Sequence, residues 1–240
     1  SQVKQFDPSR GQNTQVVVNE ISPFFAISAF FVTPDGWLLT SSRELKSVYN
    51  NGKIDIGYSV KVQTDSGQSS EIKEIIFNEN YRYAAIKVDG KYRAMPLSLS
   101  SPEGTDANAS TLLNPAADYS SFIFINAIDP IDGVEEKEHL TLQINTLENE
   151  SYSNILSFNS HGQTTGFHSH GQTTGFHLRE DHPKKVPNTK NVHLRFLRSH
   201  IIAEFRDQWK KQPSTSNLLS LDELKNLSRN ATATVLIFKQ

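Results

Sequence analysis

The stretch from residue 29 to residue 45 (AFFVTPDGWLLTSSREL) constrains the fold more than any other part of the chain. Residues 30–32 and 37–40 are two apolar runs that favour β-strands, and the Pro-Asp-Gly sequence at 34–36 between them is a turn signal. Two such runs joined by a short turn predict a β-hairpin. Because both runs are apolar, the hairpin has to be buried, and the rest of the chain has to build a β-rich core around it.

Other segments repeat this pattern of short β-favouring runs separated by turn signals. We expect further strands at 15–19, 24–27, 59–64, 72–77, 84–88, 121–126, 139–145, 191–196 and 232–238. Helical periodicity is confined to the C-terminal part. Residues 199–211 predict a helix that begins at Ser199, and Ser220 with Glu223 forms a capping-box pattern that opens a second, short helix. The sequence therefore predicts an all-β barrel or sandwich with two helices near its end.

Composition narrows the possible functions. The net charge of -2 gives no electrostatic footprint for nucleic acid. The chain has no cysteine, which excludes disulfides and thiolate metal sites. The longest apolar run, residues 24–32, is far too short to span a bilayer, and no signal peptide is visible. We expect a globular protein that neither binds nucleic acid nor spans a membrane.

The hairpin at 29–45 resembles the first hairpin of trypsin-like serine proteases of the HtrA (Deg) type, which reads roughly G-S-G-F-F-V-x-P-D-G-x-[IL]-L-T-x-x-H-V. The histidine of that pattern is the general base, and Arg43 stands in its place. The family's middle strand reads roughly [TY]-D-[LI]-A-[LV]-[LI]-x-[VI]. It resembles residues 81–88 (YRYAAIKV), where Arg82 stands in place of the aspartate that orients the histidine.

The third position of the resemblance is the nucleophile loop. In the family pattern the serine lies thirteen residues before the second-last glycine, and counting back from Gly166 gives Ser153. The glycines that flank the family's nucleophile are replaced by Ser151, Asn154 and Ile155. Those glycines supply the backbone freedom that shapes the family's oxyanion hole. This sequence lacks them, so we expect no oxyanion hole of that kind.

The resemblance thus implies a catalytically degenerate member of the family, a pseudoprotease. A serine hydroxyl needs a neighbouring base to take its proton. The guanidinium of Arg43 has no acceptor atom and does not deprotonate at working pH. Arg43 and Arg82 are either ordinary solvated or paired arginines, or an anion-binding patch in the former cleft that grips a carboxylate-bearing partner. Ser153 is either a plain loop serine or part of that cleft.

The resemblance covers about residues 17–211 and implies two antiparallel β-barrels of the chymotrypsin type. It predicts a flexible N-terminal arm at 1–14, a first barrel at 15–100, a linker at 101–118 and a second barrel with its closing helix at 119–211. Residues 212–240 are expected to form a C-terminal appendix of a short helix and a strand.

Residues 160–168 and 169–177 are the same nine letters, SHGQTTGFH, in tandem. Two copies are too few for a solenoid, and either copy suits the same strand because the two are identical. The repeat places His168 and His170 two residues apart, a spacing that lets two imidazoles of one strand face a metal ion. The alternative is a polar hairpin with solvated histidines, and most of this local histidine content comes from the duplication itself.

Three functions remain open. The first is a non-catalytic protease homologue that binds a protein partner or peptide strand, acts as a scaffold and needs no cofactor. The family resemblance places such a protein in the periplasm or cell envelope of a bacterium. The second is a metal-binding protein that uses the duplicated histidine hairpin. The third is a serine hydrolase in which a relocated base, such as a loop histidine, acts on Ser153.

Overall fold

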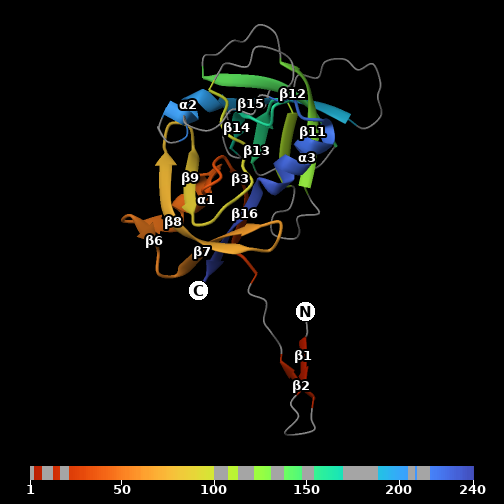
Figure 1. Ribbon diagram of the computed structural model, residues 1–240. Helices are drawn as coiled ribbons and strands as arrows, with labels where there is room; N and C mark the ends of the chain where they lie inside the picture. The colour runs from red at the N-terminus through yellow and green to blue at the C-terminus, as the bar shows by residue number, and fades with distance from the viewer. Residues whose placement is uncertain are drawn as a thin grey trace.

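The computed structural model describes residues 3–6, 13–16, 22–99, 108–112, 122–130, 138–147, 154–169, 189–204, 209 and 217–240. Two closed, six-stranded antiparallel barrels make up most of this part of the chain (Figure 1). The expected all-β pair of barrels is therefore confirmed.

The first barrel contains the hairpin predicted from residues 29–45. Its strands follow one another around the barrel in the order β16-β3-β4-β9-β8-β7. Their bounds are β3 (Phe25–Phe31), β4 (Trp37–Ser41), β7 (Tyr58–Thr64), β8 (Ser69–Asn78), β9 (Tyr83–Val88) and β16 (Thr232–Lys239). A short helix, α1 (Arg43–Lys46), follows β4, and a two-stranded ribbon of β5 (Tyr49–Asn50) and β6 (Lys53–Ile54) follows the helix.

The second barrel has the order β10-β11-β12-β15-β14-β13. Its strands are β10 (Asn108–Leu112), β11 (Phe122–Pro130), β12 (His139–Leu147), β13 (Ile155–Phe158), β14 (Thr164–His168) and β15 (Thr189–Arg198). The helix α2 (Ser199–Glu204) follows β15 directly and begins at the predicted residue. The predicted continuation of this helix to residue 211 lies outside the described residues, apart from Trp209.

The two barrels share one strand order. Numbered along the chain, the second barrel reads 1-2-3-6-5-4. The first barrel reads the same when β16, which comes from the end of the chain, is counted as its first strand. β16 pairs with β3 from Thr232 to Ile237 on one side and with β7 from Ala233 to Lys239 on the other. The same Greek-key arrangement is thus built twice, once from a continuous segment and once from two separated segments.

β16 and β10 both lie outside the barrel boundaries that the sequence predicts. The predicted appendix (212–240) supplies β16, and the predicted linker (101–118) supplies β10. The physical reason is burial: Ala233, Val235 and Ile237 of β16 are fully buried, so this strand is stable only inside a barrel. The predicted short helix is present as α3 (Leu221–Asn230), and its capping box between Ser220 and Glu223 is formed.

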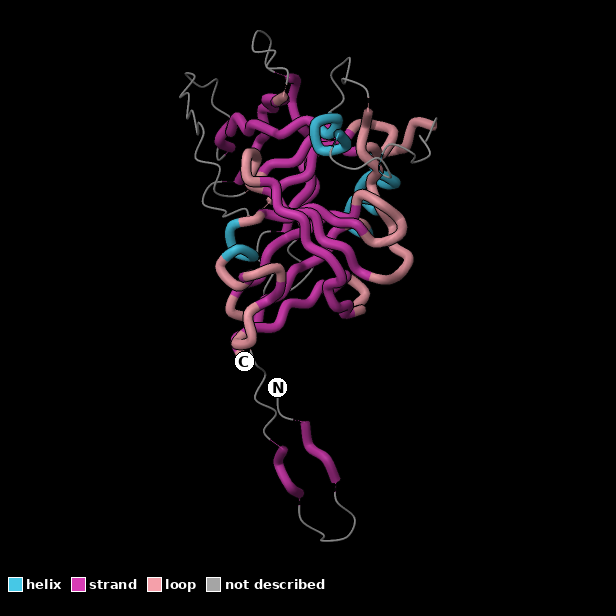
Figure 2. Tube along the Cα trace, turned by 90° about the vertical axis from the view of Figure 1, so that its left-hand side faces the viewer, coloured by secondary structure: helices cyan, strands magenta, loops and turns pink. Residues whose placement is uncertain are grey.

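Residues at the N-terminus form a separate hairpin of β1 (Val3–Phe6) and β2 (Asn13–Val16), which pair with each other. This hairpin stands apart from both barrels in the two views of Figures 1 and 2. The sequence predicts a strand at 15–19 in the first barrel, but Gln15 and Val16 pair with β1 instead.

The largest apolar cluster lies between the barrels. Strand alternation sends Phe31 and Leu38 into the first barrel, while their neighbours Phe30 and Leu39 face the second barrel. Phe30 meets Phe167 of β14 at 6.3 Å between ring centroids, and Trp37 meets Trp209 at 5.8 Å, both edge to face. The interface is thus a continuous part of the core, and it holds the edges of the candidate site in place.

Candidate functional site

Arg43 is the first residue of α1, and only Ser42 separates it from the buried strand β4. The turn that starts the helix is fixed from both sides, because Lys46 N donates to Ser42 O at 2.9 Å and Ser41 Oγ donates to Glu44 Oε2 at 2.7 Å. Ser41 and Ser42 are buried, whereas Arg43 is exposed. Arg43 therefore stands exposed on a hydrogen-bonded turn that follows the buried end of β4.

Arg82 lies in the turn between β8 and β9 and has a left-handed backbone with φ of 55°. This conformation is uncommon for residues other than glycine and asparagine, so the surroundings must hold it. The carbonyl of Arg82 accepts a hydrogen bond from Ser42 N and another from Ser169 Oγ, each at 3.1 Å. Arg82 thus joins the turn before α1 to the end of β14 in the other barrel.

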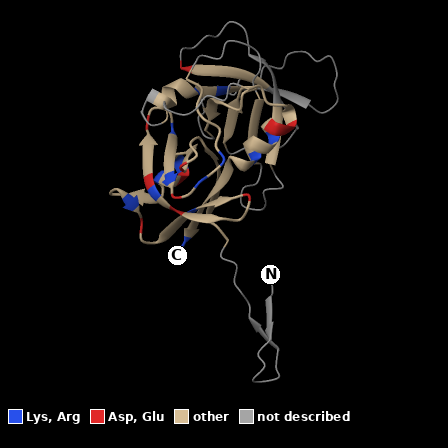
Figure 3. Cartoon of the chain, viewed as in Figure 1, with Lys and Arg blue, Asp and Glu red and all other residues tan. Residues whose placement is uncertain are grey.

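The two arginine positions are neighbours in the fold. The bond between Ser42 N and Arg82 O joins residue 82 to the residue before Arg43, and a salt bridge between Lys46 and Glu79 joins the same two segments a second time. Basic and acidic segments of the ribbon both lie around α1 in Figure 3. The structure therefore brings together the elements that carry the general base and its orienting aspartate in the family pattern.

Ser153 lies outside the described residues, but its neighbour Asn154 is placed and fully buried. The Asn154 amide donates to Ser28 O at 2.7 Å and to Thr40 Oγ1 at 3.3 Å, and both acceptors belong to the first barrel. The Asn154 carbonyl accepts from Thr111 Oγ1 of β10 at 2.5 Å. Asn154 therefore ties the chain beside Ser153 to β3, β4 and β10.

The chemistry available at the first two positions is that of cations. A guanidinium donates hydrogen bonds and accepts none, so neither Arg43 nor Arg82 can take a proton from a hydroxyl. Two guanidinium groups on adjacent turns suit carboxylate or phosphate oxygens instead. No pair of Arg43 with an acidic side chain is formed among the residues that the structure describes.

Of the two candidate metal ligands, the structure describes only His168. His170 lies outside the described residues, and His168 Nδ1 lies 2.9 Å from Arg195 O, so this nitrogen carries the proton and donates. His161 Nδ1 lies 3.2 Å from Asn217 O in the same manner. Within the described part of the chain, no group of three or more His, Asp or Glu side chains is placed to hold a metal ion.

A half-buried basic cluster lies where the Tyr81 turn meets the second barrel. The His139 ring lies 6.3 Å from the Tyr81 ring, and Arg195 Nη2 lies 3.1 Å from His139 Nδ1. Arg198 Nε donates to His139 O at 3.0 Å. Burial lowers the pKa of His139 below 6.5, Glu138 opposes this shift, and the Arg198 charge adds to it. Burial also raises the pKa of Tyr83, two residues after Tyr81, to about 12.

Three residues at the site were not singled out as binding residues by the sequence. In the sequence, Asn154 was noted only because it replaces a glycine of the family pattern. Ser169 was noted only as part of the nine-residue repeat, and His139 only as part of a predicted strand. Their partners lie 56 to 126 positions away in the chain. No local sequence pattern predicts hydrogen bonds between residues so far apart in the chain. The only hint in the sequence is that Asn154 replaces a glycine of the family pattern.

No family model matches the chain, and no curated protein matches it by sequence. Among solved structures, the chain is similar to the HtrA-type protease AlgW with a decapeptide. The two are 13% identical with a TM-score of 0.44, and the match covers 77% of this chain and 51% of that chain. The chain thus spans about half the length of that protein. No described helix is long and apolar enough to cross a membrane.

Proposed function

We propose that this chain is a non-catalytic trypsin-like protease homologue that binds a protein or peptide partner in the former substrate cleft. The proposal rests on one backbone hydrogen bond, which Ser42 N donates to Arg82 O. Arg82 is thus one of the two bonded residues, and Arg43 directly follows the other. The elements of the base and its orienting group meet there, and neither arginine accepts a proton.

The same arrangement indicates which partner fits. Arg43 and Arg82 are exposed, and each stands on a turn whose backbone is fixed by hydrogen bonds. Two guanidinium groups that extend from adjacent, fixed turns favour a carboxylate, because each can donate charge-assisted hydrogen bonds to its oxygens. The partner is therefore a peptide segment with an acidic side chain or a free C-terminal carboxylate. A cell-envelope location is part of this proposal and rests on the family resemblance alone.

The experiment is a screen of ten-residue peptides, immobilised through either end, followed by fluorescence anisotropy on the strongest binders. The test variant is Arg43→Ala combined with Arg82→Gly. Glycine at residue 82 keeps the left-handed turn without strain, so the variant removes the guanidinium and leaves the turn in place. We expect at least a tenfold loss of affinity and a flatter dependence of affinity on salt.

The matched control is Arg93→Ala combined with Lys239→Ala, which removes two exposed cations of the first barrel outside the two turns. This control should bind as the unaltered protein does at each salt concentration. Equal affinity in the test variant and the unaltered protein would refute the arginine cleft, and equal losses in test and control would mean only a general charge effect.

A further inference from the structure

The first copy of the nine-residue repeat is fully integrated in the fold. Thr164 joins β14 to the first barrel, because its N–H donates to Pro96 O and its carbonyl accepts from Ser98 N, both at 2.8 Å. Thr165 Oγ1 lies 3.1 Å from Ser157 Oγ, and Phe167 is buried in the core between the barrels. Every one of these contacts uses a residue that recurs nine positions later.

Two glycines of this copy are sterically required. A Cβ on Gly166 would lie 2.7 Å from Phe196 Cβ and 2.9 Å from Ser157 Oγ. Gly162 has φ of 72°, and a Cβ there would lie 2.7 Å from Leu227 Cδ2. The second copy supplies Gly171 and Gly175 at the equivalent positions. The second copy therefore also has glycine at the two positions where a Cβ would clash.

We propose that β14 has two registers, in which residues 164–168 or residues 173–177 fill the same place in the second barrel. A shift of nine residues lengthens the connection from β13 to β14 and shortens the connection from β14 to β15 by the same amount. Residues 178–188 remain to reach β15 in the second register. Loop closure depends only weakly on loop length, so the two connections nearly compensate each other. This inference does not depend on the proposed function.

The two registers differ at their borders, and the differences favour the first copy. Asn159 precedes that copy, and its Oδ1 accepts from His161 N at 3.1 Å and from Gln163 N at 3.0 Å. His168 would take its place in the second register and cannot accept both bonds in the same way. Ser169 follows the first copy and donates to Arg82 O, whereas Leu178 would follow the second. The shift therefore breaks a bond to the turn that carries Arg82.

Engineered disulfides distinguish the registers, because the chain has no cysteine of its own. The pair Ser157→Cys and Thr165→Cys reports the first register, since the two side-chain oxygens lie 3.1 Å apart. The pair Ser157→Cys and Thr174→Cys reports the second register. The pair Ser157→Cys and Thr173→Cys is the control, because the equivalent Thr164 directs its hydroxyl to Met95 O.

Each variant is oxidised under native conditions, and disulfide content is read from the intact mass after thiol alkylation. We expect the Thr165 pair to close fastest, the Thr174 pair to close more slowly but to completion, and the Thr173 pair to stay reduced. A Thr174 pair that closes no faster than the Thr173 pair overturns the proposal.

Valine substitutions give a second measurement that does not depend on cysteine geometry. Gly166→Val excludes the first copy from β14, and Gly175→Val excludes the second. We expect Gly175→Val to leave the melting temperature unchanged and Gly166→Val to lower it by only a few degrees. The double variant should lose cooperative unfolding. If Gly166→Val alone loses it, the second copy does not replace the first and the proposal is wrong.

Discussion

The two barrels share a strand order but close in different ways. The second barrel takes all six strands from residues 108–198, whereas the first takes five from residues 25–88 and the sixth from residues 232–239. The C-terminal segment crosses from one barrel to the other on its way to that place. Leu219 N donates to Ser160 O of the second barrel, and after α3 the chain enters the first barrel as β16.

This difference shows that a barrel needs a strand of suitable burial, whatever its position in the chain. A closed barrel has no open edge, and without β16 both β3 and β7 would present unpaired backbone groups. The end of the chain therefore stabilises the first barrel and also fastens it to the second.

A charge placed in β16 should unfold the first barrel. Val235 is fully buried between β3 and β7, so Val235→Asp leaves a carboxylate without a partner in the core. We expect a loss of more than about 4 kcal/mol in the free energy of unfolding, measured by urea titration with circular dichroism. The control Lys239→Asp, at the exposed end of the same strand, should change it by about 0.5 kcal/mol or less. A stable Val235→Asp variant would show that β16 is dispensable.

Asn154→Ala should loosen the junction between the barrels. The variant removes the amide that bonds Ser28 O and Thr40 Oγ1, and Ser28 and Thr40 are fully buried. We expect a loss of about 1–3 kcal/mol by the same titration. Asn50→Ala, an exposed asparagine outside the interface, should cost about 0.5 kcal/mol or less. Equal losses in the two variants would contradict the bridging role of Asn154.

Acidification should destabilise the fold partly through His139. The pKa of His139 is lowered from 6.5 by burial, so below pH 6.5 the unfolded chain binds this proton more readily than the folded chain does. Stability therefore falls as the pH drops from 7 towards 5. His139→Gln should show a shallower fall over the same range in thermal melts at several pH values. Parallel pH profiles for the two proteins would count against this role of His139.

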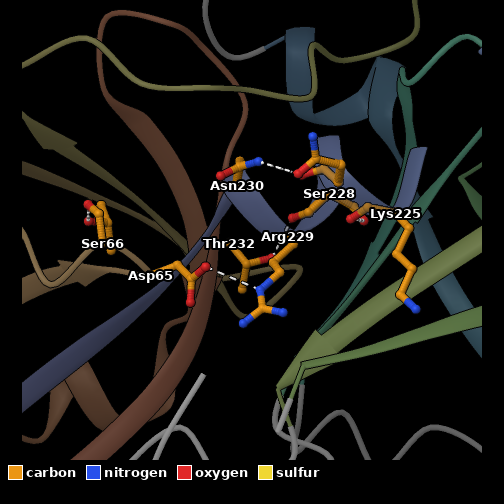
Figure 4. A network of polar contacts seen from close by, with 9 residues as sticks. Asp65, Ser66, Lys225, Ser228, Arg229, Asn230 and Thr232 are labelled. Atoms are coloured by element: carbon orange, nitrogen blue, oxygen red, sulfur yellow. Dashed lines mark hydrogen bonds and ion pairs between the residues drawn. The ribbon is translucent and has the colours of Figure 1, made fainter. Parts of the chain in front are cut away.

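The contact between α3 and the first barrel at Arg229 should contribute least. Arg229 Nε lies 3.1 Å from Asp65 Oδ2, in the network of Figure 4, but the Arg229 side chain remains 45% exposed. Exposed ion pairs contribute about 0–1 kcal/mol, so Arg229→Ala should cost no more than that, and less in high salt. A loss above about 2 kcal/mol would mean that this contact, and not β16 alone, fastens the two barrels.

The sequence predicts those parts of the fold that carry local signals. The hairpin at 29–45 follows from two apolar runs around a Pro-Asp-Gly turn, and the start of α3 follows from Ser220 and Glu223, three residues apart. The position of β16 within the first barrel cannot be predicted from local signals. The sequence predicts Thr232–Phe238 as a strand, but its partners lie about 170 and 205 positions earlier, and no local pattern records them.

The candidate site likewise has parts that the sequence predicts and parts that it does not. Arg43 and Arg82 were identified from the resemblance of residues 29–45 and 81–88 to two segments of HtrA-type proteases. The structure places their turns together. The left-handed backbone of Arg82 was not predicted, because that conformation is favoured by glycine or asparagine at the position itself and arginine gives no such signal. The bridge made by Asn154 depends on two barrels docking, which only tertiary structure supplies.

The most direct test of the proposed non-catalytic role is labelling with a fluorescent fluorophosphonate, which reacts with activated serine nucleophiles. The unaltered protein and its Ser153→Ala variant are compared at equal concentration, with an active trypsin-like protease as the positive control. We expect the same background signal in both proteins. Label that appears in the unaltered protein and disappears in Ser153→Ala would reveal a working nucleophile and contradict the central claim.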